Sequence, residues 1–571
     1  MHVATTRRQH KDKVYETHLL RRSYREDGKV KNETLANLSH LPPATIQLIR
    51  ESLSGTSHVV AGEGFEIERT LPHGQVALLW ALAHQLGFEK LLGPAGRERD
   101  LALSLIIARC AKPTSKLATM RWWADTTLGC DLVGDASSDE VYAAMDWLVA
   151  RQGMIESSLA RRHLSEGSMV LYDLSSSWME GAHCPLAARG YSRDKKSGKT
   201  QIEYGLMTDR EGRPISIEVF AGNTADPTAF VSAVETVRKR FKLREVVMVG
   251  DRGMITSARI EALRGFGGIS WVTCLRAPAI KALAEREAIQ LSLFDETNLA
   301  EITHPDYPGE RLVACRNPAL AAERARKRAE LLAATEVELN VVAAAVSRER
   351  RSLRGEDRIA LRVGKVVNRY KMAKHFEIAI SEDTFNFSRR QGAIDAEASL
   401  DGIYVIRTNV APERLDAAGA VTTYKGLAVV ERNFRNMKAI DLELRPIYHF
   451  TEDRVRSHVF ICMLAAYLLW HLRRAVAPLC FTDEEVPRRD DPVAPATRST
   501  QARSKDASKT TANGEAVHDL SSLLNHLSTL TRNTIVFTGG VRIDKLTLAT
   551  PLQRRAFELI GAPIPTRIGH A

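Results

Sequence analysis

The spacing of apolar residues divides the chain into segments with different predicted structures. Between residues 1 and 165 the apolar positions favour helices, as in the run from Leu101 to Cys110. Ser137 to Glu140 has the form of a capping box, which predicts that a helix begins there. We therefore predict a mainly helical N-terminal domain over residues 1–165. The domain contains helix-break-helix pairs. Such pairs can dock in a DNA major groove, but in proteins generally they are more often plain α-hairpins.

Short apolar runs replace this pattern over residues 166–276. They predict strands at 169–174, 201–207, 214–220, 246–250 and 269–275, and helices at 228–241 and after Thr256. A polar loop follows the first strand, and a hairpin turn at 209–213 joins the next two. The resulting order, β-β-β-α-β-α-β, matches that of a ribonuclease H-like core. We predict an α/β fold with a mixed sheet flanked by helices.

The predicted core is interrupted before it is completed. Residues 277–400 are too long for a loop and predict an inserted subdomain, with helices within 318–353 and strands at 358–367 and 376–380. Residues 401–480 complete the core with a strand at 402–407, a helix that contains Glu431, and an apolar helix at 453–474.

The remaining residues predict a linker and a tail. Residues 481–518 are rich in Asp, Arg, Pro, Ser, Thr and Lys, which is typical of a flexible linker. We expect residues 519–571 to form a C-terminal tail that serves dimerisation or DNA contact. It contains a short strand at 534–537 and a terminal helix capped by Thr550.

Composition narrows the class of partner. The 571 residues are 44% hydrophobic, as in a globular protein, and carry a net charge of +11. That charge favours a polyanionic partner, although a merely soluble basic protein has the same balance. The seven cysteines are scattered without metal-ligand spacing, which fits reduced thiols in a cytoplasm. No apolar leader opens the chain, and the longest apolar run, Val459 to Trp470, is too short to span a bilayer.

Three carboxylates carry the candidate chemistry. Asp173 ends one apolar run, Asp251 ends another, and Glu431 lies in a helical stretch from residue 424 to 438. Carboxylate oxygens suit Mg²⁺, and two such ions can serve the attacking and leaving oxygens of a displacement. On a basic protein they predict a metal site for phosphoryl transfer on nucleic acid.

Each carboxylate also has a structural interpretation. Asp173 could cap the turn at Ser175 to Ser177, and Asp251 could belong to a turn with Arg252 as its ion partner. Glu431 could pair with Arg435 one helical turn later.

The helix around Glu431 has an unusual face. Three- and four-residue spacing brings Tyr424, Leu427, Glu431, Phe434 and Lys438 to one side. A Tyr, a Glu and a Lys on a largely apolar face suit the wall of an active site better than plain core. We assign Glu431 to metal, and Tyr424 and Lys438 to phosphate.

These residues resemble those of the DDE transposases of bacterial insertion sequences, in family four and its sixteen-thirty-four relatives. That family has a Tyr-x₂-Arg-x₃-Glu-x₆-Lys motif, which Tyr424, Glu431 and Lys438 match in this sequence. Leu427 stands at the Arg position, which removes one DNA-phosphate contact. The similarity runs from about residue 165 to 475 and includes further matching segments at 172–177, 190–194, 205–206, 220–226, 249–253, 445–449 and 453–458.

The resemblance implies a ribonuclease H-like fold and a cut-and-paste reaction. Asp173, Asp251 and Glu431 would hold two Mg²⁺ ions, with Mn²⁺ as a substitute. Water would cut a transposon end, and the 3′-hydroxyl formed would attack target DNA by the same in-line route. The implied partners are double-stranded DNA, both end repeats and target, and a second copy of the chain in a synaptic homodimer. The implied location is the bacterial cytoplasm, at the nucleoid, without a membrane.

Some roles remain open at this stage. Arg193 and Lys195, in a loop that also carries Lys196 and Lys199, are candidate DNA contacts, although a solvated charge run is the more common case. One alternative function is a ribonuclease H-like nuclease or resolvase that cuts without strand transfer. Another is a decayed derivative that only binds DNA. The three carboxylates argue against decay, whereas Leu427 argues weakly for it.

Overall fold

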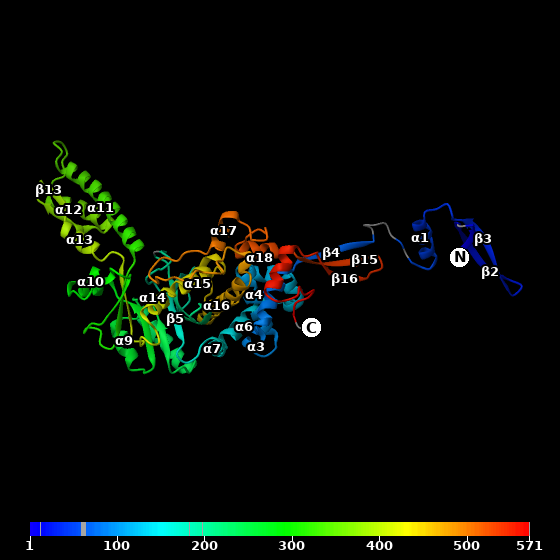
Figure 1. Cartoon of the computed structure of the whole chain (residues 1–571), viewed down its shortest axis with the longest axis horizontal. Helices are drawn as coiled ribbons and strands as arrows, with labels where there is room; N and C mark the ends of the chain where they lie inside the picture. The colour runs from blue at the N-terminus through cyan, green and yellow to red at the C-terminus, as the bar shows by residue number, and fades with distance from the viewer. Residues whose placement is uncertain (12, 57, 59–63, 182, 197, 570–571) are drawn as a thin grey trace. The chain divides into compact units, whose positions relative to one another are not determined.

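The computed structural model describes residues 1–11, 13–56, 58, 64–181, 183–196 and 198–569. The chain forms two compact units, which are coloured along the sequence in Figure 1. The first unit contains Met1–Leu71 and Thr531–Thr547. The second contains Pro72–Leu530 and Leu548–Ala571.

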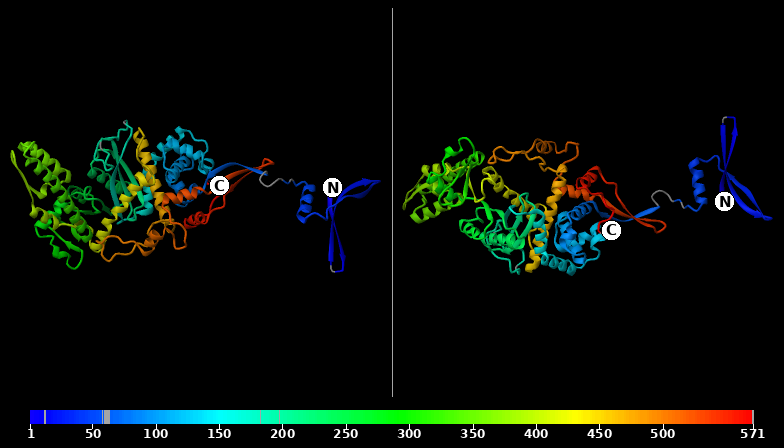
Figure 2. Two further views of the ribbon diagram at one scale, coloured as in Figure 1. Left: turned by 90° about the horizontal axis from the view of Figure 1, so that it is seen from above. Right: turned by 60° about the horizontal axis from the view of Figure 1, so that its bottom comes forward.

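The first unit begins with a sheet, where the sequence pattern predicted helices. Strands β1 (His2–His10), β2 (Lys13–Glu26) and β3 (Lys29–Asn37) are antiparallel, and β2 pairs with both neighbours to form two ribbons (Figure 2). Asp27 and Gly28 connect β2 to β3 with φ angles of 52° and 74°. This left-handed pair is the two-residue hairpin turn that an Asp-Gly sequence favours. The prediction of a mainly helical region from residue 1 was wrong because it overlooked that turn.

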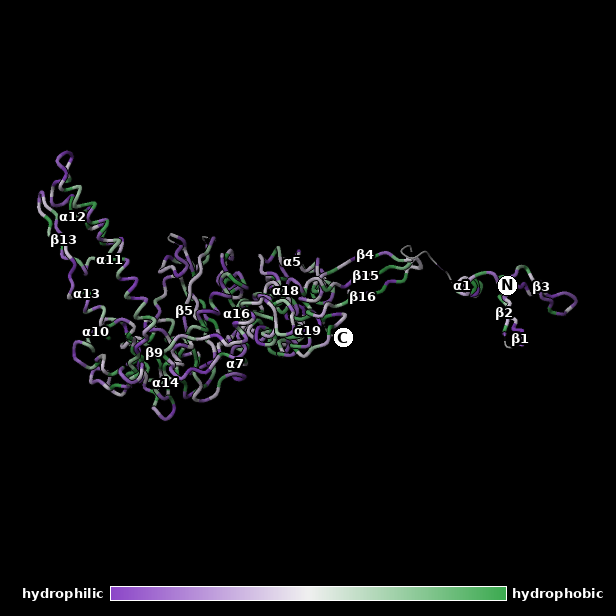
Figure 3. The backbone as a smooth tube through the Cα atoms, turned by 45° about the horizontal axis from the view of Figure 1, so that its top comes forward, coloured by the Kyte–Doolittle hydropathy of each residue, from purple (hydrophilic) through white to green (hydrophobic). Residues whose placement is uncertain are grey.

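The rest of the first unit joins distant parts of the chain. Helix α1 (Pro43–Leu53) follows β3. A second sheet has the order β16-β15-β4 and contains β4 (Phe65–Pro72), β15 (Thr531–Phe537) and β16 (Arg542–Leu546). Hydrophilic residues predominate along the β2–β3 ribbon (Figure 3). Residues 519–571 are therefore not a separate tail, because β15 and β16 belong to the first unit.

The predicted helices are present from residue 74 onward, in the second unit. They are α2 (Gly74–Gln85), α3 (Phe88–Leu92), α4 (Arg97–Ala111), α5 (Lys116–Ala124), α6 (Ser138–Ala150) and α7 (Gln152–His163). The capping box of Ser137 and Glu140 opens α6 as predicted. Thr550 and Gln553 form another at the start of α19 (Pro551–Leu559). Helix α18 (Leu520–Ser528) packs against α2.

The apolar helix predicted near the end of the core is α16 (Glu452–Ala475), which packs against α4, α6 and β7. It is long and apolar enough to cross a membrane, with a mean hydropathy of 1.4 over 18 residues. However, 83% of that stretch is buried inside the protein. Burial on all sides explains its uniform hydrophobicity, as in the core helix of a large domain.

The second unit is built on an eight-stranded mixed sheet with the order β10-β11-β14-β9-β8-β5-β6-β7. The predicted strands correspond to β5 (Met169–Trp178), β6 (Gln201–Thr208), β7 (Pro214–Ala221), β8 (Val246–Val249), β9 (Ile269–Cys274) and β14 (Ile403–Thr408). Helices α8 (Asp226–Glu235) and α9 (Ser257–Arg264) alternate with them. Strand β5 is parallel to β8 and antiparallel to β6, which confirms a mixed α/β fold.

Strand β5 is longer than predicted. Ser175 to Ser177 are buried and continue the pairing with β6, so they form no polar loop. Asp173 consequently lies inside the strand rather than at its end. Gly205 on β6 allows this arrangement, because a Cβ there would lie 2.0 Å from the hydroxyl of Tyr172. That hydroxyl donates a hydrogen bond to the Ala229 carbonyl at 3.1 Å and fixes β5 to α8.

Part of the predicted insertion belongs to the main sheet. Strands β10 (Leu299–Ile302) and β11 (Arg311–Arg316) extend the sheet beyond β14, and α10 (Ala277–Glu285) packs beside β14. Glu310, just before β11, is buried and accepts hydrogen bonds from Arg407 at 2.6 and 2.7 Å. The inserted body is thus shorter than residues 277–400.

The inserted body has its own apolar cluster. It contains α11 (Pro318–Val346), α12 (Glu356–Tyr370), β12 (Phe376–Ile380), β13 (Phe385–Arg389) and α13 (Gln391–Ala398). Residues 358–367 were predicted as a strand but lie in α12. Their β-branched residues suggested a strand, whereas Ile359, Val363 and Val367 recur every four residues and bury one helical face.

The predicted flexible linker at 481–518 packs against the second unit instead. It contains α17 (Thr500–Ser508), and Val493 is completely buried. The Lys425 ammonium donates hydrogen bonds to the carbonyls of Pro492 and Val493, both at 2.7 Å. The polar composition of this segment hid its few buried residues, of which Val493 is the most completely buried.

Val493→Ala is expected to lower the free energy of unfolding by about 2 kcal/mol, because it removes two buried methyl groups and leaves a cavity. Urea unfolding measures this loss. Limited proteolysis should also cut the variant faster within residues 484–498. The exposed Val486, which lies in the same segment, provides the matched control, and Val486→Ala should change neither measurement.

Candidate active site

Strand register brings Asp173 and Asp251 to the same level of the sheet. Leu171 of β5 lies opposite Val249 of the parallel strand β8. Asp173 and Asp251 each follow two residues later, and the Asp251 carboxylate is near enough to contribute to the raised pKa of Asp173. Asp251 follows the end of β8, as predicted, after Gly250.

Glu431 reaches the same region from a helix that packs against β5. The helix predicted over residues 424–438 is divided into α14 (Ala417–Lys425), α15 (Leu427–Arg435) and a π-helical turn (Asn436–Ile440). A cavity of about 670 Å³ is lined by all three carboxylates. It is also lined by Arg193, Tyr424, Leu427, Phe434, Arg435 and Lys438, among others.

The charges of this cavity perturb its buried acid. Burial raises the pKa of Asp173 to about 7, and the neighbouring Asp251 and Glu431 carboxylates act in the same direction. The backbone N–H of Leu174, which donates to Asp173 at 2.8 Å, opposes the shift. The Tyr424 hydroxyl lies 3.4 Å from Oδ1 of Asp251. Burial is therefore the main cause of the raised pKa of Asp173, and the two neighbouring carboxylates add to it.

This donor set fits a divalent cation in its chemistry. All three side chains offer carboxylate oxygens, the ligands that Mg²⁺ prefers, and a bound cation would offset both the burial of Asp173 and the repulsion from Asp251 and Glu431 that together raise its pKa. Among the residues that the structure describes, no three acidic, His or Cys side chains are close enough together to hold a metal ion.

The raised pKa of Asp173 predicts a pH-dependent stability in protein freed of metal by EDTA. An aspartate with an ordinary pKa of 3.8 has a pKa of about 7 here, so the folded state binds a proton that the unfolded state lacks between those values. The contribution of this proton to the free energy of unfolding is complete below pH 3.8 and is lost as the pH rises to about 7.

Asp173→Asn should remove this loss. The difference in unfolding free energy between variant and wild type should grow with pH by up to about 1.4 kcal/mol per unit within that window. Urea unfolding at several pH values measures it. The comparison is needed because burial also raises the pKa of Glu203 to about 7, which adds a loss of the same sign in both proteins. A difference that does not change with pH would contradict the assignment.

The basic side chains in and around the cavity differ in their partners. Lys438 is buried and pairs with Asp194 at 3.0 Å, and Arg445 pairs with the same oxygen. Arg435 lines the cavity, whereas Arg432 lines a different one on the other side of α15. Arg435 is thus the arginine available near Leu427.

The two predicted loop contacts differ in their surroundings. Arg193 pairs with Asp226 at 2.6 Å and with Glu203 at 3.2 Å, so two carboxylates hold its guanidinium at the cavity wall. Lys195 is exposed and has a φ of 56°. Arg193 is a positioned part of the site, and Lys195 remains a candidate DNA contact.

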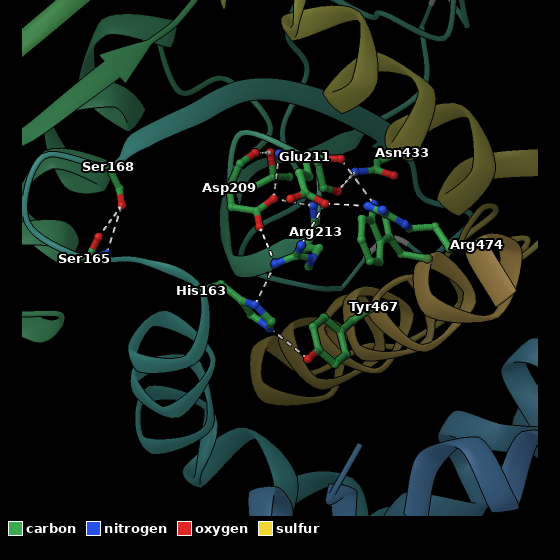
Figure 4. Close-up of polar contacts among 12 residues, drawn as sticks. His163, Ser165, Ser168, Asp209, Glu211, Arg213, Asn433, Tyr467 and Arg474 are labelled. Carbon is green, nitrogen blue, oxygen red and sulfur yellow. Dashed lines mark hydrogen bonds and ion pairs between the residues drawn. The ribbon is translucent and has the colours of Figure 1, made fainter. Parts of the chain in front are cut away.

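Helix α15 is fixed from the side opposite Glu431. Asn433 comes two residues after Glu431, roughly half a turn away, and donates a hydrogen bond to the Gly212 carbonyl at 2.8 Å. Gly212 lies in the β6–β7 turn, where Arg213 pairs with Asp209 at 3.0 Å and with Glu211 at 2.7 Å (Figure 4).

Helices α7 and α16 hold the same turn. Burial lowers the pKa of His163 to about 4, so its neutral ring accepts from Arg213 at 3.0 Å and donates to Tyr467 at 2.9 Å (Figure 4). The turn therefore links α15 to the helical part of the unit.

Sequence reasoning overlooked the acids that hold these cations, namely the buried Asp194 and Glu203 and the partly exposed Asp226. Asp194 and Asp226 stand in segments that were noted for their resemblance, so the signal was present. Their partners come from distant elements, which no local spacing reveals.

Comparison with known proteins identifies the family. Residues 3–59 match the family described as IS1634 family transposase, N-terminal domain, and residues 181–469 match the Transposase DDE domain. Asp173 lies just before the second match, which includes Asp251 and Glu431.

No curated protein matches the chain. Among solved structures, a piggyBac transposase synaptic complex with hairpin DNA is similar at 11% identity, covering 72% of this chain and 84% of that one. Its TM-score of 0.25 is too low to establish a shared fold. The domain match spans half of the sequence, and the chain accordingly belongs to the DDE transposases of the IS1634 family, enzymes of DNA transposition that generally use divalent metal ions.

Proposed function

We propose that this transposase moves DNA by a cut-and-paste route, with Asp173, Asp251 and Glu431 as the ligands of two Mg²⁺ ions, or of Mn²⁺ in their place. The observation that carries the proposal is that three carboxylates, from two parallel strands and a facing helix, line one cavity. When bound, the ions would supply Lewis-acid stabilisation of the attacking and leaving oxygens.

We also propose that the core is ribonuclease H-like. The sheet contains the order β7-β6-β5-β8-β9, in which β6 alone runs against the other four. This order supports the assignment independently of motifs. It brings Asp173 of β5 close to Asp251, which follows the adjacent strand β8, and the Glu431 helix packs against β5.

The chain's own residues would position the DNA. Tyr424 and Lys438 would bind a terminal phosphate. Arg435 would replace the arginine that the family motif has where this chain has Leu427, because the Arg435 side chain lines the same cavity. Arg193 would orient the loop that carries Lys195, which would contact the flanking DNA. With these groups fixed in place, phosphoryl transfer depends mainly on positioning and charge stabilisation.

The remaining domains have proposed roles as well. The N-terminal region to residue 165 would bind the transposon ends, and residues 519–571 would contribute to DNA contact or dimerisation. A homodimer would bring the two ends together. A basic protein acting at the bacterial nucleoid fits these roles.

A strand-transfer assay tests the proposal. The full chain with MgCl₂ is incubated with duplexes that carry its own element's terminal inverted repeats and with supercoiled target DNA. We expect cleavage at the repeat ends and joining of the 3′ ends to the target. Cleavage without joining would favour a resolvase-type nuclease, and binding without cleavage would favour a decayed derivative.

A further inference from the structure

A second cavity of the same unit, separate from the one that contains the carboxylates, has no assigned role. Its volume is about 310 Å³. It lies among the end of α4, the start of α5, α6, α16 and the segment after the π-helical turn. Its walls include Arg109, Lys116, Tyr142, Arg445, His449 and His458.

Two of its cations are buried without a counter-ion. Arg109 is 5% exposed and Lys116 is 6% exposed. Arg109 donates to the carbonyls of Thr114 at 3.0 Å and Leu442 at 3.4 Å, and Lys116 donates to His458 at 3.3 Å. Within the described part of the chain, neither side chain forms an ion pair with a carboxylate. Buried charges are normally paired, because leaving them unpaired is costly.

The surroundings that the structure describes supply no negative charge to these two side chains, and burial, together with the neighbouring Arg109, lowers the pKa of Lys116 well below its ordinary value. Burial lowers the pKa of His458 well below its ordinary value and that of His449 to about 3, so both rings are neutral. His458 donates from Nε2 to the Leu444 carbonyl at 2.9 Å, which leaves Nδ1 to accept from Lys116. The acid among the lining residues, Glu443, is exposed. The first turn of α5 adds the positive end of a helix at the same wall.

One residue connects this cavity to the catalytic one. Arg445 lines it and pairs with Asp194, which in turn pairs with Lys438 of the catalytic cavity. We propose that the Arg109–Lys116 cavity binds a phosphate group of the DNA backbone next to the phosphate held at the catalytic carboxylates. Arginine and lysine are the side chains that neutralise DNA phosphates. The assignment of the bound anion to a DNA phosphate rests on the proposed transposase function. The proposal that the cavity binds an anion does not depend on that function.

The first test uses inorganic phosphate and no catalysis. Sodium phosphate should raise the thermal unfolding midpoint of the wild-type chain saturably, and NaCl at equal ionic strength should not. Lys116→Met should abolish the phosphate effect and, without phosphate, unfold at the same or a higher temperature, since it removes an unpaired buried cation. Lys112→Met, which removes an exposed lysine four residues earlier, should keep the full phosphate effect.

The second test distinguishes DNA from free phosphate. Binding of a duplex transposon end is measured against salt, with EDTA present so that cleavage plays no part. Lys116→Met should weaken binding about ten-fold at physiological salt and lower the slope of log K against log salt by about 0.9, as for one lost phosphate contact. Lys112→Met should leave both unchanged.

Each outcome decides the proposal. A wild-type protein that phosphate stabilises no more than chloride would overturn the anion site, and this arm needs no variant to fold. A variant that loses the phosphate effect but binds DNA with the wild-type slope would overturn the DNA assignment and indicate a site for free phosphate. If DNA is bound as expected but never cut, the catalytic proposal fails while this one stands.

Discussion

Replacing Asp173 by Asn, Asp251 by Asn or Glu431 by Gln is expected to lower cleavage of transposon-end DNA by more than about a thousand-fold. Each change removes one anionic ligand while keeping the shape of the side chain, and charge stabilisation of the transferring phosphoryl group is a large part of such catalysis. DNA binding, measured in EDTA, should stay within about three-fold of wild type, because cations supply most of that affinity.

The control is Glu413→Gln, a carboxylate exposed near the end of β14 that does not line the cavity. It should cleave at the wild-type rate. A stoichiometric test adds to this comparison, since calorimetric binding of Mg²⁺ should weaken in all three site variants and not in the control. Near-full cleavage by any one of the three would show that its carboxylate is not a ligand.

The central part of the fold was predictable from the sequence because of its physical simplicity. Strands β5, β8 and β9 are largely buried, and β8 and the first four residues of β5 are continuous apolar runs, so the two aspartates stand out where polarity returns. The face that contains Tyr424, Glu431 and Lys438 was also recognisable, since a π-helical turn and a break at Gly426 still leave all three on the cavity wall.

Other parts depended on contacts between distant residues. Strands β10 and β11 are short, and they join the sheet only because β11 pairs with β14 and β10 pairs with β11. Val493 anchors a polar segment through a lysine 68 residues earlier, which no composition measure detects. The β2–β3 hairpin needed no distant contact for its prediction. Asp27-Gly28 is a local signal for a hairpin turn, and the prediction of helices overlooked it.

The arrangement of cations is the part of the site that only the structure reveals. Lys438 was predicted to bind phosphate and Arg193 was a candidate DNA contact, but in the structure Arg193, Lys438 and Arg445 are each paired with a buried acid. Such pairs fix the geometry of long flexible side chains in advance, so less ordering remains when DNA binds. Asp194 is central to this arrangement, because Lys438 faces the catalytic cavity and Arg445 faces the second cavity.

Asp194→Asn is consequently expected to lower the free energy of unfolding by about 3–5 kcal/mol, because it leaves two cations without their shared counter-charge. The Asp194 carboxylate is 3% exposed, with Lys438 at 3.0 Å. Urea unfolding measures the loss, and the exposed pair of Arg286 and Asp306 supplies the control. Asp306→Asn should cost less than about 1 kcal/mol.

A double-mutant cycle separates this ion pair from a general packing defect. Lys438→Met in the Asp194→Asn background should recover part of the lost stability, since it removes a cation that the first change left unpaired. In the wild-type background the same Lys438→Met change should destabilise the protein, because Asp194 then loses one partner. Effects that simply add in the double variant would contradict a direct interaction. Cleavage should remain low in the double variant even where stability recovers, because Lys438 is then absent from the catalytic cavity.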